Sequence, residues 1–187
     1  MKNGDSMLIK KLRLENFISH KKTEIEFEEG INLLIGENGA GKTSILDAIS
    51  FSLFKDHGRG KTLENIIMRG EGRAEVTLEF TVNGKIYRVH REVRREGRGV
   101  KTFSRLYENN TLKAYSDSEV NKEIQRILEI DRHLFLNSIY VRQGEIEKLI
   151  EAKPSERKEI ISRLFGIHDL QTAYEKMRDI INEFEIK

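Results

Sequence analysis

The chain has 187 residues, which is long enough to bury a hydrophobic core and predicts one domain with an appendage. Hydrophobic residues make up 37% and charged residues 34%, no apolar run approaches a membrane-spanning length, and no signal-peptide core is present, so we expect a cytoplasmic protein without membrane contact. The absence of cysteine excludes disulfides and thiolate-bound zinc in this segment, and any metal is expected to arrive with a bound ligand.

Two β-strands are predicted at the start of the chain. Leu8, Leu12 and Leu14 share one side of an extended segment, although the alternation is imperfect. A second strand is expected over residues 22–27. Two glutamates and a glycine then turn the chain into the apolar run of residues 31–35, which we interpret as a third strand.

A glycine-rich loop follows this run, and the rest of the chain is organised around it. The loop reads Gly36-Glu37-Asn38-Gly39-Ala40-Gly41-Lys42-Thr43, and the helix-like residues 44–54 come next. Glycines let successive backbone N–H groups converge on a phosphate, and the helix N-terminus adds partial positive charge. Lys42 is placed to reach the β- and γ-phosphates, and the Thr43 hydroxyl suits Mg²⁺. The pattern predicts a nucleoside triphosphate with magnesium; the alternative is a glycine-rich surface turn.

The middle of the chain predicts β-hairpins. Asn83-Gly84 is the strongest short-range turn signal and centres a hairpin over residues 75–91. Counting outward from a two-residue loop gives a register that is consistent on both faces, with these pairs: Val82 with Lys85, Phe80 with Tyr87, Leu78 with Val89, and Glu79 with Arg88. Residues 103–107 and 112–115 predict another strand pair, so this half is expected to be a mixed or antiparallel β region.

The segment from Lys85 to Arg105 is basic, with eight Lys or Arg residues against Glu92 and Glu96. Such a hairpin could contact DNA phosphates without reading sequence, or its charges could simply be solvated.

Helices are predicted after the hairpins. Ser116 and Glu119 form a capping box that opens a helix with an apolar stripe of Val120, Ile124, Ile127 and Leu128. A further helix is expected over residues 154–165, ended by Gly166. Beyond it, apolar residues at 170, 174, 177, 181 and 184 have the spacing of a coiled-coil seam, although an ordinary amphipathic helix has the same pattern.

The sequence supplies only part of a hydrolytic site. A P-loop enzyme also needs an apolar strand ending in Asp, often followed by Glu, to hold magnesium and orient water. No run of four apolar residues here ends in an acid, and no Ser-Gly-Gly stretch could contact a γ-phosphate across a dimer.

An early phosphate loop followed by a coiled coil, without the remaining catalytic residues, resembles the SMC-like (structural maintenance of chromosomes) branch of the ABC-type ATPases. Three segments narrow the resemblance: residues 16–20 (Asn-Phe-Ile-Ser-His), residues 36–44, and above all residues 135–146 (Phe-Leu-Asn-Ser-Ile-Tyr-Val-Arg-Gln-Gly-Glu-Ile). They resemble the N-terminal half of the archaeal-type Rad-fifty/SbcC family, ATPases of the DNA double-strand-break repair complex.

The resemblance implies roles for individual residues. Gln143 would touch magnesium and sense the γ-phosphate, so Lys42 and Gln143 would act in catalysis while Thr43 and Gln143 hold the metal; a buried or capping glutamine is the alternative. The nucleotide is expected to contact these residues: Asn38, Gly39, Ala40, Gly41, Lys42, Thr43 and Ser44 at the phosphates, Ile67, Met68 and Arg69 near the adenosine, and Ile18.

Some of these roles have strong alternatives. Core packing is an equally good role for Ile67 and Met68, and Ile18 stands where relatives often carry Lys or Arg. His20 either borders the nucleotide or is a structural histidine.

The implied fold is α/β: the N-terminal lobe of an ABC-type P-loop ATPase head with a β subdomain over residues 1–166, then the start of a coiled-coil arm over residues 167–187. The C-terminal lobe of the same protein would complete the site, and two heads would sandwich two ATP molecules with Mg²⁺. A nuclease subunit and DNA are the implied partners, in a nucleoid-associated protein whose isolated fragment is inactive. A chromosome-condensing SMC protein and a self-contained P-loop kinase remain alternatives.

Overall fold

The computed structural model describes residues 7–56, 62–130, 132 and 135–136. The chain divides into two compact units, residues 1–129 and 130–187, and nearly all of the described residues belong to the first. Gln143, the helix expected over 154–165 and the coiled-coil seam lie outside the described residues.

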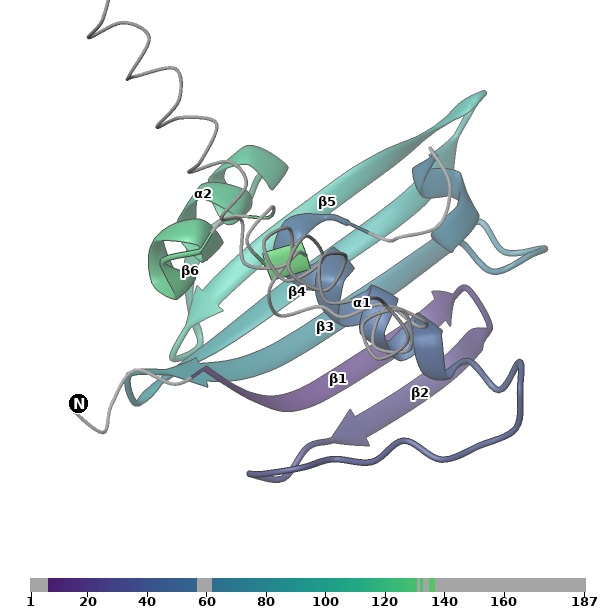
Figure 1. Ribbon diagram of the computed structural model, residues 1–187. Coiled ribbons are helices and arrows are strands. Elements are labelled where there is room, and N and C mark those ends of the chain that lie inside the picture. Colours follow the sequence, from purple (N-terminus) through teal and green to yellow (C-terminus); the bar gives the residue numbers. More distant parts are fainter. Residues whose placement is uncertain (1–6, 57–61, 131, 133–134, 137–187) are drawn as a thin grey trace, which may run out of the picture. The chain divides into compact units, whose positions relative to one another are not determined.

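The first unit is built on a six-stranded antiparallel sheet in the order β2-β1-β3-β4-β5-β6 (Figure 1). The strands are β1 (Leu8–Phe17), β2 (His20–Glu26), β3 (Arg73–Val82), β4 (Lys85–Glu96), β5 (Gly99–Glu108) and β6 (Thr111–Ala114). The helices are α1 (Lys42–Phe54), the short 3₁₀-helix η1 (Leu63–Ile66) and α2 (Asp117–Leu128). This α/β arrangement confirms the antiparallel β region expected from the sequence.

The predicted hairpin register is confirmed at every pair. Val82 lies opposite Lys85 and Phe80 opposite Tyr87, with Glu79 facing Arg88 on the other side of the sheet. The turn needs positive φ angles, which Asn83 (51°) and Gly84 (75°) adopt at little steric cost. The Phe80 and Tyr87 rings stack with centroids 5.5 Å apart, so the register also places an aromatic pair in the core.

A β-bulge explains the imperfect alternation at the start of the chain. Ile9 pairs with Phe80, but Lys11 pairs with Glu79, so β1 carries one extra residue between them. The bulge brings Ile9 onto the face that Phe80 occupies, and Leu12 and Leu14 beyond it are fully buried. Leu8, which pairs with Thr81, lies on the opposite face from Leu12 and Leu14, so the prediction that the three leucines share one side is wrong for Leu8.

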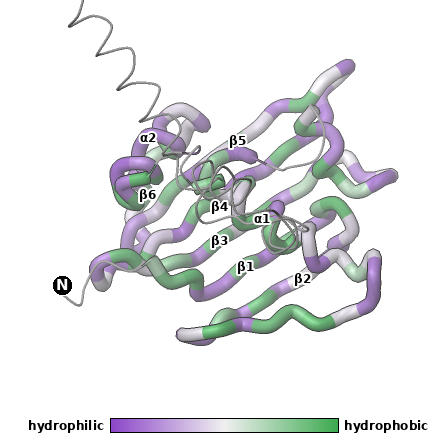
Figure 2. Tube along the Cα trace, in the orientation of Figure 1, coloured by the Kyte–Doolittle hydropathy of each residue, from purple (hydrophilic) through white to green (hydrophobic). Residues whose placement is uncertain are grey.

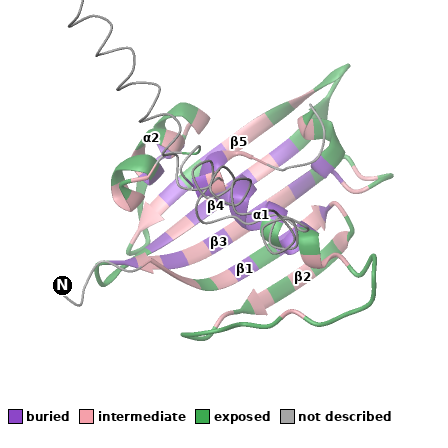
Figure 3. Ribbon diagram, in the orientation of Figure 1, coloured by how far each residue is buried: buried purple, intermediate pink, exposed green. Residues whose placement is uncertain are grey.

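The two faces of the sheet differ in character. Helices α1 and α2 cover one face, and Figure 3 shows the buried residues concentrated in α1 and the central strands. The fully buried strand residues on this face include Leu12, Val76, Leu78, Phe80, Val89, Arg91, Val93 and Leu106. Alternate residues of the same strands form the opposite face, which is rich in charged side chains.

The capping box is confirmed at the start of α2. The Glu119 N–H donates to the Ser116 hydroxyl at 3.3 Å, and the Glu119 carboxylate accepts in return from the Tyr115 N–H at 3.4 Å. Val120 and Ile124 of the predicted stripe are fully buried. No helix in the described part of the chain is both long and apolar enough to span a membrane.

The structure corrects the prediction of a strand over residues 31–35. This segment is extended but pairs with no strand among the described residues, and Ile31, Leu33 and Ile35 are 101%, 78% and 86% exposed. Figures 2 and 3 show the run after β2 as hydrophobic yet exposed. A strand forms only where a neighbour supplies hydrogen bonds, so an apolar, β-prone run predicts the need for a partner but does not provide one.

A buried arginine joins the helices to the sheet. Arg91 of β4 is 1% exposed and donates to two carbonyls at the end of α1, Ser52 O at 2.7 Å and Leu53 O at 3.2 Å. It also donates to the Ser104 hydroxyl at 2.9 Å and to Asn121 Oδ1 of α2 at 2.7 Å. Burial lowers the pKa of Arg91 to about 10, and the cation is stabilised by these acceptors and by Asp117.

Asp117 accepts the other hydrogen bonds of the network around Arg91. Its carboxylate accepts from Lys55 at 2.6 Å, from the Thr102 and Ser104 hydroxyls, and lies 3.7 Å from Arg91 Nη1. Burial alone would raise the pKa of Asp117, but the hydrogen bonds from Lys55, Ser104 and Thr102 outweigh it, so the pKa lies below the ordinary 3.8.

Asp117 therefore stabilises the fold above its unfolded-state pKa, and this contribution is lost as the pH falls below 3.8 towards the folded-state pKa. We expect Asp117→Asn to lower the free energy of unfolding by about 1–3 kcal/mol at pH 7, and the difference from wild type to narrow at pH 3 and below. Urea unfolding across this pH range measures both. Glu123→Gln on the exposed side of α2, where Glu123 pairs with Arg126 at 2.8 Å, is the control, with a change of about 0.5 kcal/mol or less. A pH-independent difference for Asp117→Asn would contradict this role.

Candidate nucleotide-binding site

The phosphate loop predicted from the sequence lies directly before α1. Gly39 (φ 87°) and Gly41 (φ 90°) are both in the left-handed region, where only glycine fits without strain. The Ala40 N–H donates to Glu37 O at 3.2 Å, and this hydrogen bond closes the turn over residues 37–40. Gly41 is the N-cap of α1 and provides no side-chain cap, so no N-cap side chain competes with an anion for the N-terminus of this helix.

Lys42 is the positive charge of the loop. Its ammonium donates to the carbonyl oxygens of Gly36 at 2.7 Å and Glu37 at 2.8 Å, so the side chain folds back along the loop. An ammonium has three N–H donors, and these two contacts leave one for a further acceptor. The side chain is therefore held beside the loop amides, as the phosphate-binding motif requires.

The other predicted residues of the loop divide by exposure. Asn38, Gly39, Ala40 and Thr43 are exposed. Ser44 is only 1% exposed and its side chain belongs to the interior of the unit. An exposed threonine in the first turn, beside a lysine and a helix N-terminus, fits a triphosphate carrying Mg²⁺, which prefers oxygen ligands.

The segments predicted to lie near the adenosine meet at the turn between β1 and β2. The Ile18 N–H donates to Ile66 O at 2.8 Å, and the Met68 N–H donates to Asn16 O at 2.8 Å, around a bridge between Phe17 and Ile67. The structure thus brings Ile18 and the residue 67–69 segment together, although they are about fifty positions apart in the sequence. Ile67 is buried, which fits core packing, whereas Arg69 is exposed.

Ile18 occupies a strained position in this turn. Its φ angle is 52°, in the left-handed region that a β-branched residue rarely adopts. The hydrogen bonds of the Ile18 N–H to Ile66 O and of the Met68 N–H to Asn16 O hold the backbone there. A motif residue in a sparsely populated conformation is typical of a functional turn.

His20 connects the same turn to the phosphate loop. Its Nε2 lies 3.1 Å from Gly41 O, and its Nδ1 lies 3.0 Å from the Thr23 hydroxyl. Phe17, at the other end of the turn, is fully buried with its ring centroid 6.0 Å from that of Phe51 in α1. The turn, the loop and α1 are therefore joined, and the sequence did not predict this contact between His20 and Gly41.

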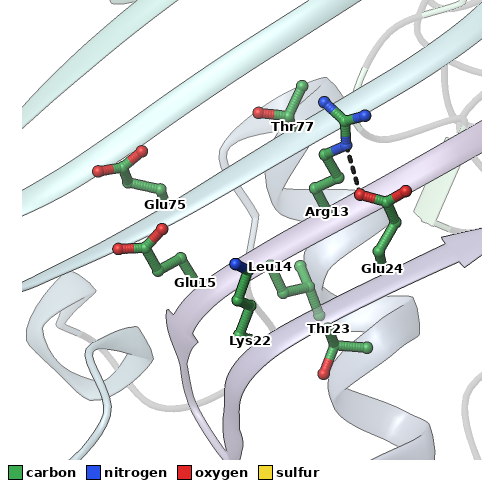
Figure 4. A pocket seen from close by; sticks show the side chains of 8 residues that line it. All are labelled: Arg13, Leu14, Glu15, Lys22, Thr23, Glu24, Glu75 and Thr77. Carbon is green, nitrogen blue, oxygen red and sulfur yellow. Dashed lines mark hydrogen bonds and ion pairs between the residues drawn. The ribbon is translucent and has the colours of Figure 1, made fainter.

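The charged face of the sheet is a separate candidate site. Near β1–β3 it has a shallow depression lined by Arg13, Leu14, Glu15, Lys22, Thr23, Glu24, Glu75 and Thr77 (Figure 4). Arg13 pairs with Glu24 at 2.7 Å, and Glu15, Glu75 and Glu92 are direct neighbours across three strands. These carboxylates make this part of the face unfavourable for a phosphate backbone.

The β4–β5 part of this face is basic and aromatic. The Arg88 guanidinium lies 4.7 Å from the centroid of the Tyr107 ring, and Arg94 and Lys101 lie 5.3 and 5.4 Å from that of Phe103. Arg105 is exposed on the same face, opposite His90.

The basic segment is nevertheless less positive than its sequence indicates. Arg91 is buried on the other face, and Lys85, Arg94 and Arg95 pair with Glu108, Glu92 and Glu64. The burial of Arg91 could have been predicted from the sequence. Arg91 lies two residues from both Val89 and Val93, and alternate residues of a strand point to the same face.

Comparison with known proteins identifies the family. The family described as AAA domain matches residues 11–187. The chain is 44% identical over 179 residues to the DNA double-strand break repair Rad50 ATPase of Methanococcus maripaludis, covering 96% of this chain and 18% of that protein. It is also 44% identical over 180 residues to the protein of the same name from Methanocaldococcus jannaschii, covering 96% and 17%. The chain thus spans less than a fifth of the length of either relative.

Solved structures show the fold. The recombination mediator protein RecF-ATP is similar with a TM-score of 0.53 at 20% identity, over 86% of this chain and 38% of that chain. The SMC head domain from Thermotoga maritima is similar with a TM-score of 0.50 at 24% identity, over 78% and 51%. These likenesses confirm the ATPase-head fold. The chain therefore belongs to the AAA domain family, in its Rad50 branch, and corresponds to the N-terminal region of those proteins.

Proposed function

We propose that this chain is the ATP-binding lobe of a DNA double-strand-break repair ATPase. The observation that carries the proposal is the loop from Gly36 to Thr43. Gly39 and Gly41 have left-handed backbone there, the Lys42 ammonium folds back along the loop before the N-terminus of α1, and the chain is of the Rad50 branch. The loop amides and Lys42 would bind the β- and γ-phosphates, and Thr43 would hold Mg²⁺ together with Gln143. Magnesium would neutralise phosphate charge when bound.

The exposed apolar run of residues 31–35 supports the need for a second lobe. Ile31, Leu33 and Ile35 alternate along one side of an extended segment that enters the phosphate loop, and the backbone of this segment has no strand partner among the described residues. An apolar row beside free N–H and C=O groups is a template for strand addition. We propose that the C-terminal lobe of the same protein adds strands here and supplies the missing catalytic residues.

ATP hydrolysis would then require both lobes and a second head, so that two ATP molecules lie between two heads and the chain alone is inactive. Engagement of the heads would control an associated nuclease and the tethering of DNA in the nucleoid. An SMC-type condensing protein would share the fold, and the identity to Rad50 relatives favours repair.

DNA would lie over the β4–β5 part of the charged face and avoid the acidic depression. Arg88, Arg105 and Lys101 would provide cations for phosphates there, and the Tyr107 and Phe103 rings contact Arg88 and Lys101. Such contacts give affinity that falls as salt rises. In fluorescence anisotropy with duplex DNA, Arg105→Glu is expected to weaken binding and reduce the salt slope, whereas Lys22→Glu, at the far end of the same face, is not.

ATP binding is the first test. We expect the 187-residue chain to bind Mg²⁺-ATP, and Lys42→Ala to weaken binding roughly tenfold to hundredfold, because hydrogen bonds to charged groups are lost. Isothermal titration calorimetry measures both, with Lys21→Ala as the exposed-lysine control. Equal binding by wild type and Lys42→Ala, or brisk ATP cleavage by the chain alone, would contradict the proposal.

Assembly is the second test. When the C-terminal lobe of the same protein and ATP are added, we expect light scattering to detect a dimer of heads. Leu33→Glu should abolish assembly, because it puts a charge in the proposed interface, while changing the stability of the isolated chain by only about 0.5 kcal/mol, since this side chain is exposed. Ile86→Glu, at another exposed apolar residue, is the matched control. Assembly that tolerates Leu33→Glu would rule out this segment as the interface.

A further inference from the structure

The contact between His20 and Gly41 has a defined direction. A carbonyl oxygen only accepts hydrogen bonds, so Nε2 of His20 must carry the hydrogen donated to Gly41 O over 3.1 Å. In the neutral ring Nδ1 then has no hydrogen and accepts from the Thr23 hydroxyl over 3.0 Å. The Gly41 carbonyl therefore selects the tautomer, and the Thr23 hydroxyl, which can donate or accept, is compatible with it.

This contact fixes one particular peptide unit. In a trans peptide the C=O and the following N–H point in opposite directions, so holding Gly41 O towards His20 aims the Lys42 N–H away from it. The same carbonyl also accepts from the Ile45 N–H at 3.3 Å, the first hydrogen bond of α1. The orientation of the Gly41–Lys42 peptide is thus set from outside the helix as well as by the helix itself.

The approach of His20 requires that residue 41 have no side chain. A Cβ on Gly41 would lie 2.6 Å from His20 Nε2 and 2.8 Å from the Ser19 hydroxyl oxygen, closer than real contacts allow. Gly39, which is equally left-handed, has nothing within 4 Å of such a Cβ. Close packing against the β1–β2 turn is therefore specific to Gly41, at the junction of loop and helix.

We propose that His20 is a positioning residue that holds the Gly41–Lys42 peptide with its N–H aimed at the phosphate site before the nucleotide binds. The expected effect on affinity rests on the proposed ATP binding, but the geometry of the loop is testable without nucleotide. Preorganised N–H groups bind an anion better because no conformational freedom is lost on binding.

Substituting His20 by glutamine or by asparagine distinguishes a positioning role from a general structural role. The side-chain amide nitrogen of Gln reaches about as far as Nε2 of histidine, whereas that of Asn reaches only as far as Nδ1. His20→Gln can therefore still donate to Gly41 O, and His20→Asn cannot. Both variants are polar and similar in size, so a histidine that merely fills the turn would be replaced equally well or equally badly by either.

The experiment compares wild type, His20→Gln, His20→Asn and the exposed-site control Lys21→Ala in the full 187-residue chain. Hydrogen exchange of the Ile45 amide, whose acceptor is Gly41 O, is measured without nucleotide, Mg²⁺-ATP affinity by calorimetry, and thermal unfolding checks the fold. For His20→Asn we expect exchange to be about fivefold to tenfold faster and affinity weaker by a similar factor, the effect of one hydrogen bond. His20→Gln should stay within about twofold of wild type in both.

The outcomes separate this inference from the proposed function. If His20→Asn and His20→Gln behave alike, in exchange and in unfolding, the positioning role is overturned whether or not ATP binds. If the contrast in exchange is present but wild type binds no ATP, the role of His20 in the loop stands and the proposed function fails.

Discussion

The position of α1 is the constraint on which the rest of this unit depends, and it is set at both ends. At the C-terminal end the buried guanidinium of Arg91 donates hydrogen bonds to two carbonyls of the last turn. At the N-terminal end the β1–β2 turn contacts Gly41 through His20. A cation at a helix C-terminus also interacts favourably with the helix dipole. Gly41, where the phosphate loop joins α1, is therefore held against the sheet, although the loop residues before it are exposed.

Local features of the fold could be read from the sequence because their causes are local. Asn83 and Gly84 adopt the positive φ angles of a two-residue hairpin, and that turn alone sets the register of β3 with β4. Ser116 and Glu119 likewise specify the start of α2 within four residues. The phosphate loop belongs to this class too, since Gly39, Gly41 and Lys42 act on neighbouring backbone.

Features that depend on distant residues could not be read in the same way. Nothing near His20 in the sequence indicates that it meets Gly41, and the bulge in β1 becomes visible only when its pairing with β3 is known. By sequence Arg91 belongs to the basic segment, although the alternation along β4 places it with Val89 on the buried face. The run over residues 31–35 has the composition of a strand, but a strand needs a neighbour that the described residues do not supply.

That apolar run has a consequence for the chain when it is handled by itself. An extended segment with Ile, Leu and Ile facing solvent, and without proline, can pair edge to edge with another copy, so self-association at high concentration is expected to begin here. Carboxylates flank the run, with Glu28 and Glu29 before it and Glu37 after it. In a stack of identical copies these like charges would lie close together, which opposes aggregation while leaving the run open to a partner of different charge.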